Sequence, residues 1–435
     1  MRTYRALSSD LYDRFRTTRL DAGPVVGMSV ALPDVAATPD TRRQWFAGLD
    51  GVRFIAAFLI ILHHAGFASG ATFRWEFGGL LLGRMDIGVS IFFVLSGFLL
   101  YRPFVVAQFD DSAPPMSGPF WIRRLVRIFP AYWVALLFLL AIGTVTVNGL
   151  RGFVLSFTLT HVYSPSTAVT GITQSWSLAT ELGFYLMLPA IAAGARRFSK
   201  GRSDSPPRSM NRQALWLLVA CGALALFSVV FRIVMAEFSP YEDNSWGALS
   251  RLWTPSYLDI FGAGMALAVI SAWADRRSLI RTATEAATRR VWLWWVIAAL
   301  TFWFLSSQLD LERGLQLADV GRELIRQTLY GVVGIAMIAP VIFVRRGTSG
   351  FVAFLAWRPL AWLGVVSYGI YLWHQAAIEW TMEILDWPDL TGNFLVLVIS
   401  ATLVSTAIAA LSHRFVEEPS SQYVRGRLSS RGRGK

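Results

Sequence analysis

The sequence predicts an all-α integral membrane protein built as a bundle of about ten transmembrane helices. Hydrophobic residues make up 54% of the chain and charged residues 16%, and the mean hydropathy is +0.47. This composition is too apolar for a soluble protein. About ten apolar segments have the roughly 20-residue length that a helix needs to cross a bilayer. The 18 tryptophans fit side chains anchored at membrane interfaces.

The apolar segments divide the chain into a membrane domain between two polar ends. The expected spans are 52–68, 85–105, 125–147, 176–193, 213–235, 255–273, 291–307, 327–344, 360–382 and 393–412. Segment 153–163 is too short to cross, so we expect a re-entrant or interfacial piece. Residues 1–47 lack a sustained period and are interpreted as a cytoplasmic tail of low order. Residues 48–419 form the membrane domain, and 420–435 a basic cytoplasmic tail.

Basic residues concentrate in alternate loops, and the other loops carry acids. Because Lys and Arg stay on the inner side, both termini are expected in the cytoplasm of a plasma (inner) membrane protein, as an even span count also requires. The net charge is +12, but the basic residues lie between apolar runs and at the termini and do not form one amphipathic face, so no nucleic-acid partner is expected. The lone Cys221 excludes an internal disulfide, and no metal site is expected. The basic loops hold Arg123, Arg124, Arg127, Arg196, Arg197, Arg276, Arg277, Arg345 and Arg346.

The first apolar run carries Arg53 at its start and His63 and His64 near its end. A helix places His64 about 16 Å beyond Arg53 and only about 20° off its face, whereas His63 points away. An imidazole inside an apolar span marks function by default. The structural alternative is a hydrogen-bonded core histidine with an arginine that only fixes topology.

Helical rise predicts that polar groups from four helices share the outer third of the membrane. These groups are His64, Glu181, Asp259 and His374. Such a cluster in lipid favours a site, although a network of satisfied polar groups would look similar. Neighbours on the same helix faces are Tyr185, Ser367 and Tyr371.

A second group is basic and lies at the cytoplasmic side. Arg124 and Arg127 share a helix face near Arg53, and guanidinium groups bind phosphate bidentately. Topology or contact with anionic lipid headgroups is the alternative explanation. Together the two groups suggest one long ligand with phosphates at the arginines and a reactive end near His64. A coenzyme A thioester has that form.

Several motifs stand in order between Leu49 and Pro419. They are Leu49–Arg53 with His64, Gly88–Leu99, Arg124 and Arg127 with Pro130 and Tyr132, Trp176–Leu178 with Glu181, Tyr185 and Pro189, Ser367–His374, and Glu417–Pro419. The chain therefore resembles the membrane-bound acyltransferase 3 family, which O-acylates bacterial surface sugars. Ser90 stands where many members carry Asp, so that position receives no catalytic role.

The resemblance implies an O-acyltransferase, most simply an acetyltransferase, with acyl-CoA as donor and no permanently bound cofactor. The acceptor would be a hydroxyl of a cell-envelope sugar or glycolipid, reached among membrane lipids. His64 would be the general base, or would carry the acyl group as acyl-histidine, and Glu181 would orient it or grip the acceptor. Arg53, Arg124 and Arg127 would hold the coenzyme phosphates. Candidate acceptor contacts are Trp176, Tyr185, Asp259, Tyr371 and His374.

Two other classes of protein fit parts of the pattern. A proton-coupled transporter would use His64, Glu181 and His374 as a proton relay. A membrane scaffold would pair off its polar groups and leave no pocket. Because the chain ends soon after the tenth span, we also expect no fused periplasmic esterase-like domain, so an acyl relay would need a separate protein.

Overall fold

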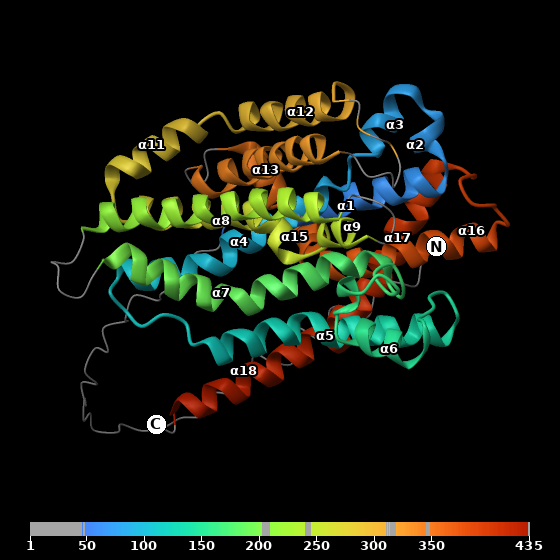
Figure 1. Cartoon of the computed structure of the whole chain (residues 1–435), viewed down its shortest axis with the longest axis horizontal. Helices are drawn as coiled ribbons and strands as arrows, with labels where there is room; N and C mark the ends of the chain where they lie inside the picture. Colours follow the sequence, from blue (N-terminus) through green and yellow to red (C-terminus); the bar gives the residue numbers. More distant parts are fainter. Residues whose placement is uncertain are drawn as a thin grey trace, which may run out of the picture. The chain divides into compact units, whose positions relative to one another are not determined.

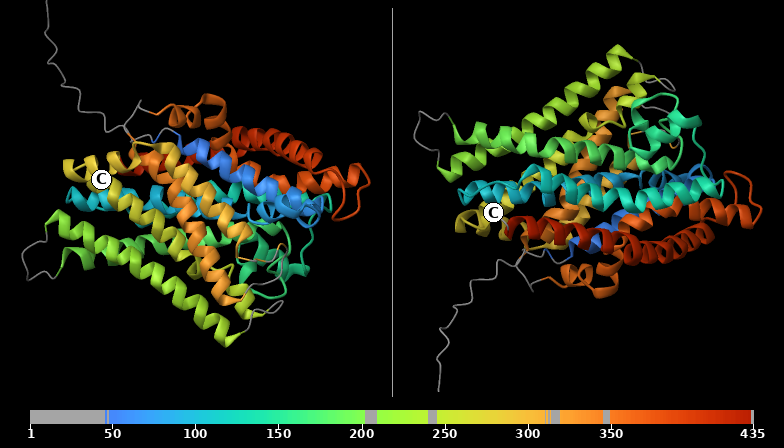
Figure 2. Two further views of the ribbon diagram at one scale, coloured as in Figure 1. Left: turned by 90° about the horizontal axis from the view of Figure 1, so that it is seen from above. Right: turned by 90° about the horizontal axis from the view of Figure 1, so that it is seen from below.

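The computed structural model describes residues 46, 48–201, 209–239, 245–309, 311, 313, 319–344 and 349–433, and within this part every regular element is helical (Figure 1). The predicted all-α architecture is confirmed. Most long helices run along the longest axis in Figure 1, and Figure 2 shows that α12 (Val291–Ser307) and α13 (Val320–Phe343), in gold and orange, cross the others obliquely. Apart from Phe46, the expected low-order tail 1–47 lies outside the described residues.

The long elements form the bundle, and short helices connect them. The long helices are α1 (Leu49–Ala68), α4 (Ile87–Phe109), α5 (Ser117–Ala141), α7 (Trp176–Lys200), α8 (Met210–Phe238), α10 (Leu258–Ala274), α12 (Val291–Ser307), α13 (Val320–Phe343), α16 (Ser367–Ile384), α17 (Phe394–Ser412) and α18 (Glu418–Arg433). The short ones are α2 (Ala71–Arg74), α3 (Glu76–Leu82), α6 (Gly149–Phe157), η1 (His161–Tyr163), η2 (Thr173–Ser175), α9 (Trp246–Ser250), η3 (Thr254–Tyr257), α11 (Ser278–Thr288), α14 (Gly350–Leu355), α15 (Arg358–Val365) and the π-helical η4 (His413–Glu417).

Eight helical runs in the described part are long and apolar enough to cross a membrane, and the pair α11–α12, bent by 62°, makes a ninth. The sequence predicts about ten, and the difference lies in the segment 360–382. This segment is split, because α15 ends at Val365 and α16 begins at Ser367. The polar residues Gln375 and Glu379 lower the apolarity of α16, which is not among the eight.

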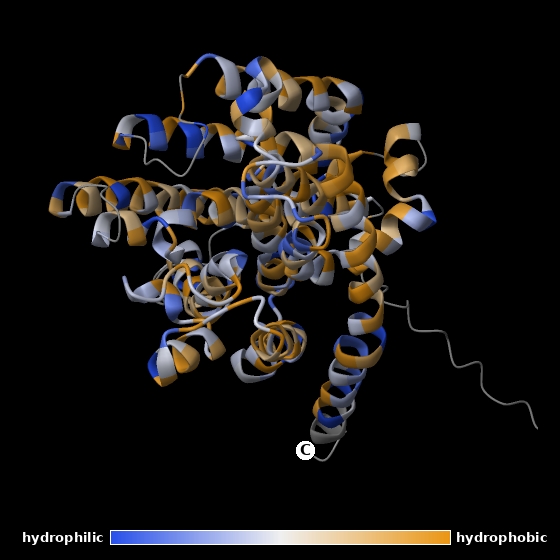
Figure 3. Ribbon diagram, turned by 90° about the vertical axis from the view of Figure 1, so that its right-hand side faces the viewer, coloured by the Kyte–Doolittle hydropathy of each residue, from blue (hydrophilic) through white to orange (hydrophobic). Residues whose placement is uncertain are grey.

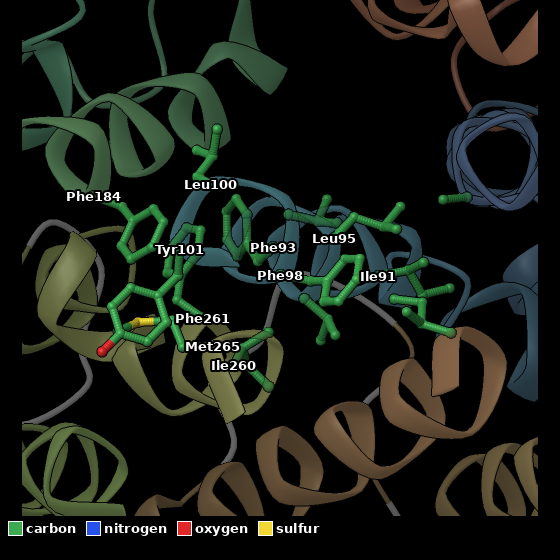
Figure 4. Packing of buried hydrophobic residues seen from close by; sticks show 14 of the residues in the cluster. Ile91, Phe93, Leu95, Phe98, Leu100, Tyr101, Phe184, Ile260, Phe261 and Met265 are labelled. Carbon is green, nitrogen blue, oxygen red and sulfur yellow. The ribbon is translucent and has the colours of Figure 1, made fainter. Parts of the chain in front are cut away.

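The core of the bundle forms around α4. Phe261 of α10 stacks on Phe93 of α4 at 4.6 Å and on Phe184 of α7 at 4.0 Å between ring centroids (Figure 4). Phe93 and Phe261 are almost fully buried, so three helices share one aromatic centre. Offset aromatic pairs of this kind contribute about 0.5–1.5 kcal/mol beyond burial of their area.

The outward faces of the bundle are apolar, as a surface in contact with lipid must be. Leu226 of α8, Leu300 of α12 and Leu403 of α17 are exposed. The last helix, α18, is mostly hydrophilic (Figure 3). The expected basic tail 420–435 is therefore helical as far as Arg433. The fold is that of a multi-pass membrane protein.

Glycines let α4 and α10 approach backbone to backbone. A Cβ atom added to Gly264 would lie 2.0 Å from the carbonyl oxygen of Val94, and one added to Gly97 would lie 2.2 Å from that of Phe261. No real Cβ atom tolerates these distances, so both positions require glycine. Small residues at helix crossings are the usual means of close packing in membranes.

We predict that Gly264→Ala separates α4 from α10 and destabilises the bundle by about 1–3 kcal/mol, because the added methyl group meets backbone that cannot turn away. Thermal unfolding in detergent, followed by aggregation or by cysteine labelling, measures this effect. Gly222→Ala is the matched control, because a Cβ atom on that α8 glycine meets nothing within 4 Å. Equal midpoints for the two variants would show that the crossing is not tight.

Candidate active site

Two histidines from helices far apart in sequence meet inside the bundle. Nδ1 of His64 on α1 lies 3.1 Å from Nε2 of His374 on α16. The same Nδ1 lies 3.0 Å from the carbonyl oxygen of Ile60, and Nδ1 of His374 lies 2.6 Å from the carbonyl oxygen of Tyr371. His374 is fully buried and His64 half-buried.

These contacts assign the tautomers of the pair. A carbonyl oxygen only accepts, so Nδ1 of each ring carries the hydrogen. Nε2 of His374 then carries a lone pair, and the single hydrogen on Nδ1 of His64 is shared between this lone pair and the carbonyl oxygen of Ile60. The remaining polar atom, Nε2 of His64, is left as an unprotonated nitrogen with a fixed direction. That is the arrangement a general base requires.

His63 faces another helix, as the 100° rotation between adjacent residues predicts. Its Nδ1 lies 3.0 Å from the carbonyl oxygen of Leu82 on α3. The rings of His63 and His64 are nearly perpendicular, with centroids 5.0 Å apart. His63 therefore contacts α3, and His64 turns toward α16.

Tyr371 fixes the backbone that orients His374. Its hydroxyl donates to the carbonyl oxygen of Gln174 at 2.7 Å and accepts from Ser177 at 2.6 Å. The side chain of Gln174 donates in turn to the carbonyl oxygen of Leu372 at 2.8 Å. These buried bonds tie the start of α7 to α16. Tyr371 thus acts first as a structural support for the histidine pair.

Glu181 belongs to a different part of the site from the one that the sequence suggested. Its Oε1 accepts from Tyr185 at 2.6 Å and from Ser96 of α4. The side chain that lies within hydrogen-bond distance of Nδ1 of His64 is that of His374 and not that of Glu181. Helical rise gives the depth of a residue but not its neighbour on the next helix.

The three expected phosphate ligands lie together below the histidines. Arg53 pairs with Asp50 at 3.0 Å and is close enough to Arg127 and Tyr185 for their charges to interact. Arg124 is similarly close to Tyr185, Glu181 and Arg127. Nε of Arg124 is buried and has no hydrogen-bond partner among the described residues. An orphaned guanidinium nitrogen in an apolar bundle is suited to receiving an anionic ligand.

The basic group and the polar group form one continuous row instead of two sites at separate depths. Because α5 begins at Ser117, Arg124 lies about 10 Å inside the helix, where it is close enough to Glu181 and Tyr185 for their charges to interact. Glu181 interacts in turn with Tyr371, whose carbonyl holds His374.

Asp259 is not brought into this row. Its carboxylate accepts from Arg232 of α8 at 2.6 Å and from Ser228 at 3.3 Å. The ion pair gives the carboxylate a structural partner away from α1 and α16. Trp176 packs beside Tyr257 of η3 at 5.8 Å between rings, at the start of α7.

Two residues that sequence reasoning passed over belong to the site. Ser96 anchors Glu181 from α4, and Glu417 of η4 interacts with Arg127. The buried carboxylate of Glu417 also lies 3.7 Å from Nδ1 of His413. The signals were present, since both lie within motifs, and π-helical turns such as η4 are frequent at functional sites.

His161 lies in the loop above the site and takes no part in the row. Its Nε2 contacts the hydroxyl of Ser175 at 3.2 Å, and burial lowers the pKa of His161 to about 4. The ring is therefore neutral at pH 7. In the described part of the chain, no group of three His, Cys, Asp or Glu side chains could hold a metal ion.

The apolar helical bundle with its internal row of arginines, carboxylate and histidines defines a polytopic membrane protein with a buried polar site. A model of the acyltransferase 3 family, described as an acyltransferase domain, matches residues 46–414. The chain belongs to this family. The matched range runs from the start of α1 to η4 and contains every residue of the row except Glu417.

Curated relatives have names that specify an O-acetyltransferase. The chain is 26% identical over 397 residues to the peptidoglycan O-acetyltransferase OatA of Listeria monocytogenes, covering 87% of this chain and 56% of that protein. It is 27% identical over 400 residues to the putative peptidoglycan O-acetyltransferase YrhL of Bacillus subtilis, covering 87% and 55%. The chain thus spans little more than half the length of these relatives. No solved structure matches it.

Proposed function

We propose that the protein is an integral-membrane O-acetyltransferase that moves an acetyl group from acetyl-CoA to a hydroxyl of a cell-envelope carbohydrate or glycolipid. The observation that carries the proposal is the row from Arg53, Arg124 and Arg127 to the histidine pair, inside the bundle of an acyltransferase family. The names of the relatives support acetyl as the group and a cell-wall glycan as the acceptor class.

The free Nε2 of His64 removes the proton from the acceptor hydroxyl. The oxygen then attacks the thioester carbonyl, a carbon–oxygen bond forms, and the carbonyl oxygen becomes an oxyanion. Collapse breaks the carbon–sulfur bond, and the thiolate of the coenzyme takes the proton back from Nε2 of His64. His64 ends neutral, so the cycle is balanced without a further reactant.

His374 supports the charged intermediate of His64. When Nε2 takes the proton, the ring is positive, and its Nδ1–H donates to the lone pair on Nε2 of His374. The bond becomes charge-assisted at that moment and is then stronger than in the neutral pair. His374 is a positioning residue because it touches His64 and not the reacting atoms. The same Nε2 of His64 would be the nucleophile if an acyl-histidine formed.

The arginines serve the donor. Arg53, Arg124 and Arg127 interact with the three acids Asp50, Glu181 and Glu417, but the buried Nε of Arg124 has no hydrogen-bond partner among the described residues, so this nitrogen lacks an acceptor. The pyrophosphate of the coenzyme would supply it. Arg53 and His64 are about 16 Å apart along α1, roughly half the apolar core of a bilayer, which an extended coenzyme arm can span.

We predict that His64→Ala lowers acetyl transfer by about 10²–10⁴-fold, since it removes the base. His374→Ala should lower it by about 10–100-fold and move the acid limb of the pH profile, because a charge-assisted bond is lost. His374→Gln, whose amide oxygen can accept from Nδ1 of His64, should restore part of the rate and shift the limb back.

The measurement is transfer of radiolabelled acetyl from acetyl-CoA to an envelope extract by reconstituted protein, with products identified by mass. His63→Ala is the control, because that ring contacts the carbonyl of Leu82 and not the site. An inactive His63→Ala beside an active His64→Ala would overturn the assignment. Full activity in both His64→Ala and His374→Ala would contradict the histidine mechanism.

We predict that Arg124→Ala and Arg127→Ala raise the KM for acetyl-CoA, each by the loss of a charge-assisted contact of about 1.5–3 kcal/mol. Lysine should rescue only in part, because it cannot bind phosphate bidentately. Arg123→Ala is the matched control, because Arg123 is next to Arg124 in the sequence but its side chain is exposed. If all three variants bind the donor equally, the buried arginines serve topology or lipid binding.

We propose that both chain ends lie in the cytoplasm, on the warrant of the arginine-rich loops. Reporter fusions after Lys435 and between Phe238 and Trp246 should then report opposite sides of the membrane. The same side for both fusions would reverse the path drawn for the donor and refute the proposed topology.

A further inference from the structure

A cavity of about 430 Å³ lies beyond the arginines, where α4, α5 and α7 end or begin. Its walls include Tyr101 and Phe104 of α4, and Pro189 of α7. Its rim carries Arg196, Arg197 and Lys200 from the last turns of α7. This volume is in the range of small-ligand sites, and apolar walls with a few charged groups are typical of them.

The cations of the rim are incompletely neutralised. Lys200 pairs with Asp111 at 2.6 Å, and this hydrogen bond and the lysine charge lower the pKa of the Asp111 carboxyl. Arg196 donates to the carbonyl oxygen of Ser112, at 3.2 Å from each of two nitrogens, and its charge acts more weakly than that of Lys200 on Asp111. Arg197 is exposed and makes no ion pair within the described residues. Two positive charges therefore remain at the rim.

The cavity continues the row of the active site. Pro189 is one turn from Tyr185, which interacts with Arg124, and Ser117 of the cavity wall is two turns from Arg124 on α5. Trp121, between them, donates to the carbonyl oxygen of Tyr185 at 3.1 Å. Arg196 lies about 16 Å along α7 from Tyr185. Figure 1 shows α4 and α7 ending at the side of the bundle away from α2 and α3.

We propose that this cavity binds the 3′-phosphorylated adenosine end of the coenzyme, with the purine against Tyr101 and Phe104 and the 3′-phosphate on Arg196 and Arg197. The inference rests on the proposed function, because it assumes a coenzyme A donor. It adds a second anchor, which separates recognition of the nucleotide from the pyrophosphate contacts at Arg124 and Arg127. Flat aromatic walls bind a purine by stacking, and paired guanidinium groups bind a terminal phosphate bidentately.

The experiment compares coenzyme A with dephospho-coenzyme A, which lacks only the 3′-phosphate, by equilibrium binding to the full chain in phosphatidylcholine nanodiscs. The wild-type protein should bind coenzyme A about tenfold more tightly. The double variant Arg196→Gln with Arg197→Gln should bind the two ligands alike. Arg281→Gln, an exposed arginine of α11, should keep the wild-type preference.

A second variant tests the cavity without changing its charge. Ala193→Trp adds a ring at a residue that lines the cavity, and should abolish binding of adenosine 3′,5′-bisphosphate. Unchanged binding of this probe would overturn the proposal.

The outcomes separate the two proposals. If wild type binds both coenzymes equally, the donor assignment stands and the cavity proposal is wrong. If it binds neither, the donor assignment fails, and the cavity proposal with it. A further measurement compares how much phosphatidylglycerol the wild type and the double variant retain in nanodiscs that contain this lipid. If the double variant retains less of the lipid but still prefers coenzyme A, the rim binds a lipid phosphate and the cavity proposal is also wrong.

Discussion

The close backbone contacts that hold α1 in the bundle determine where both ends of the candidate site lie. A Cβ atom on Gly364 would be 1.9 Å from the carbonyl oxygen of Asp50, one on Gly51 would be 2.3 Å from that of Leu355, and one on Gly88 would be 2.2 Å from that of Ala56. Glycine is therefore required on α1, α15 and α4, and the contacts lie at two levels of α1, one at Asp50 and Gly51 and one at Ala56. These contacts fix the depth of α1, and with it the positions of the residues on its polar face.

The helices and the two faces of α1 were predictable because they depend on local periodicity. Apolar length identifies a helix that must satisfy its own backbone, and a rotation of 100° per residue separates His63 from His64. The structure places these rings against α3 and α16 respectively. The acyltransferase family was also recognisable, because its motifs lie in order along the chain, and the family match over residues 46–414 confirms it.

The lateral neighbours were not predictable, because helical rise gives depth and not the identity of the adjacent helix. Asp259 is at a plausible depth for the site yet pairs with Arg232 on α8. Glu181 contacts Ser96 and Tyr185, and the partner of His64 is His374. The break between α15 and α16 falls inside a segment that is apolar on both sides, with a single valine, Val366, between the two helices. Buried ionic groups choose partners by packing, and one sequence without a structure does not specify that packing.

On the proposed function, the incomplete hydrogen bonding of the buried arginines explains how binding of the donor could promote the reaction. A buried cation without a full set of partners is unfavourable in an apolar bundle, and Nε of Arg124 lacks one. The pyrophosphate of the donor would complete the network, and this binding energy would be available to draw the thioester toward His64. The tautomers leave one lone pair there, on Nε2 of His64, and a hydroxyl group satisfies it by donating a hydrogen bond. On the proposed function, the hydrogen bond through which the acceptor hydroxyl loses its proton would also position its oxygen for attack, so donor and acceptor would meet at His64 without alternating access.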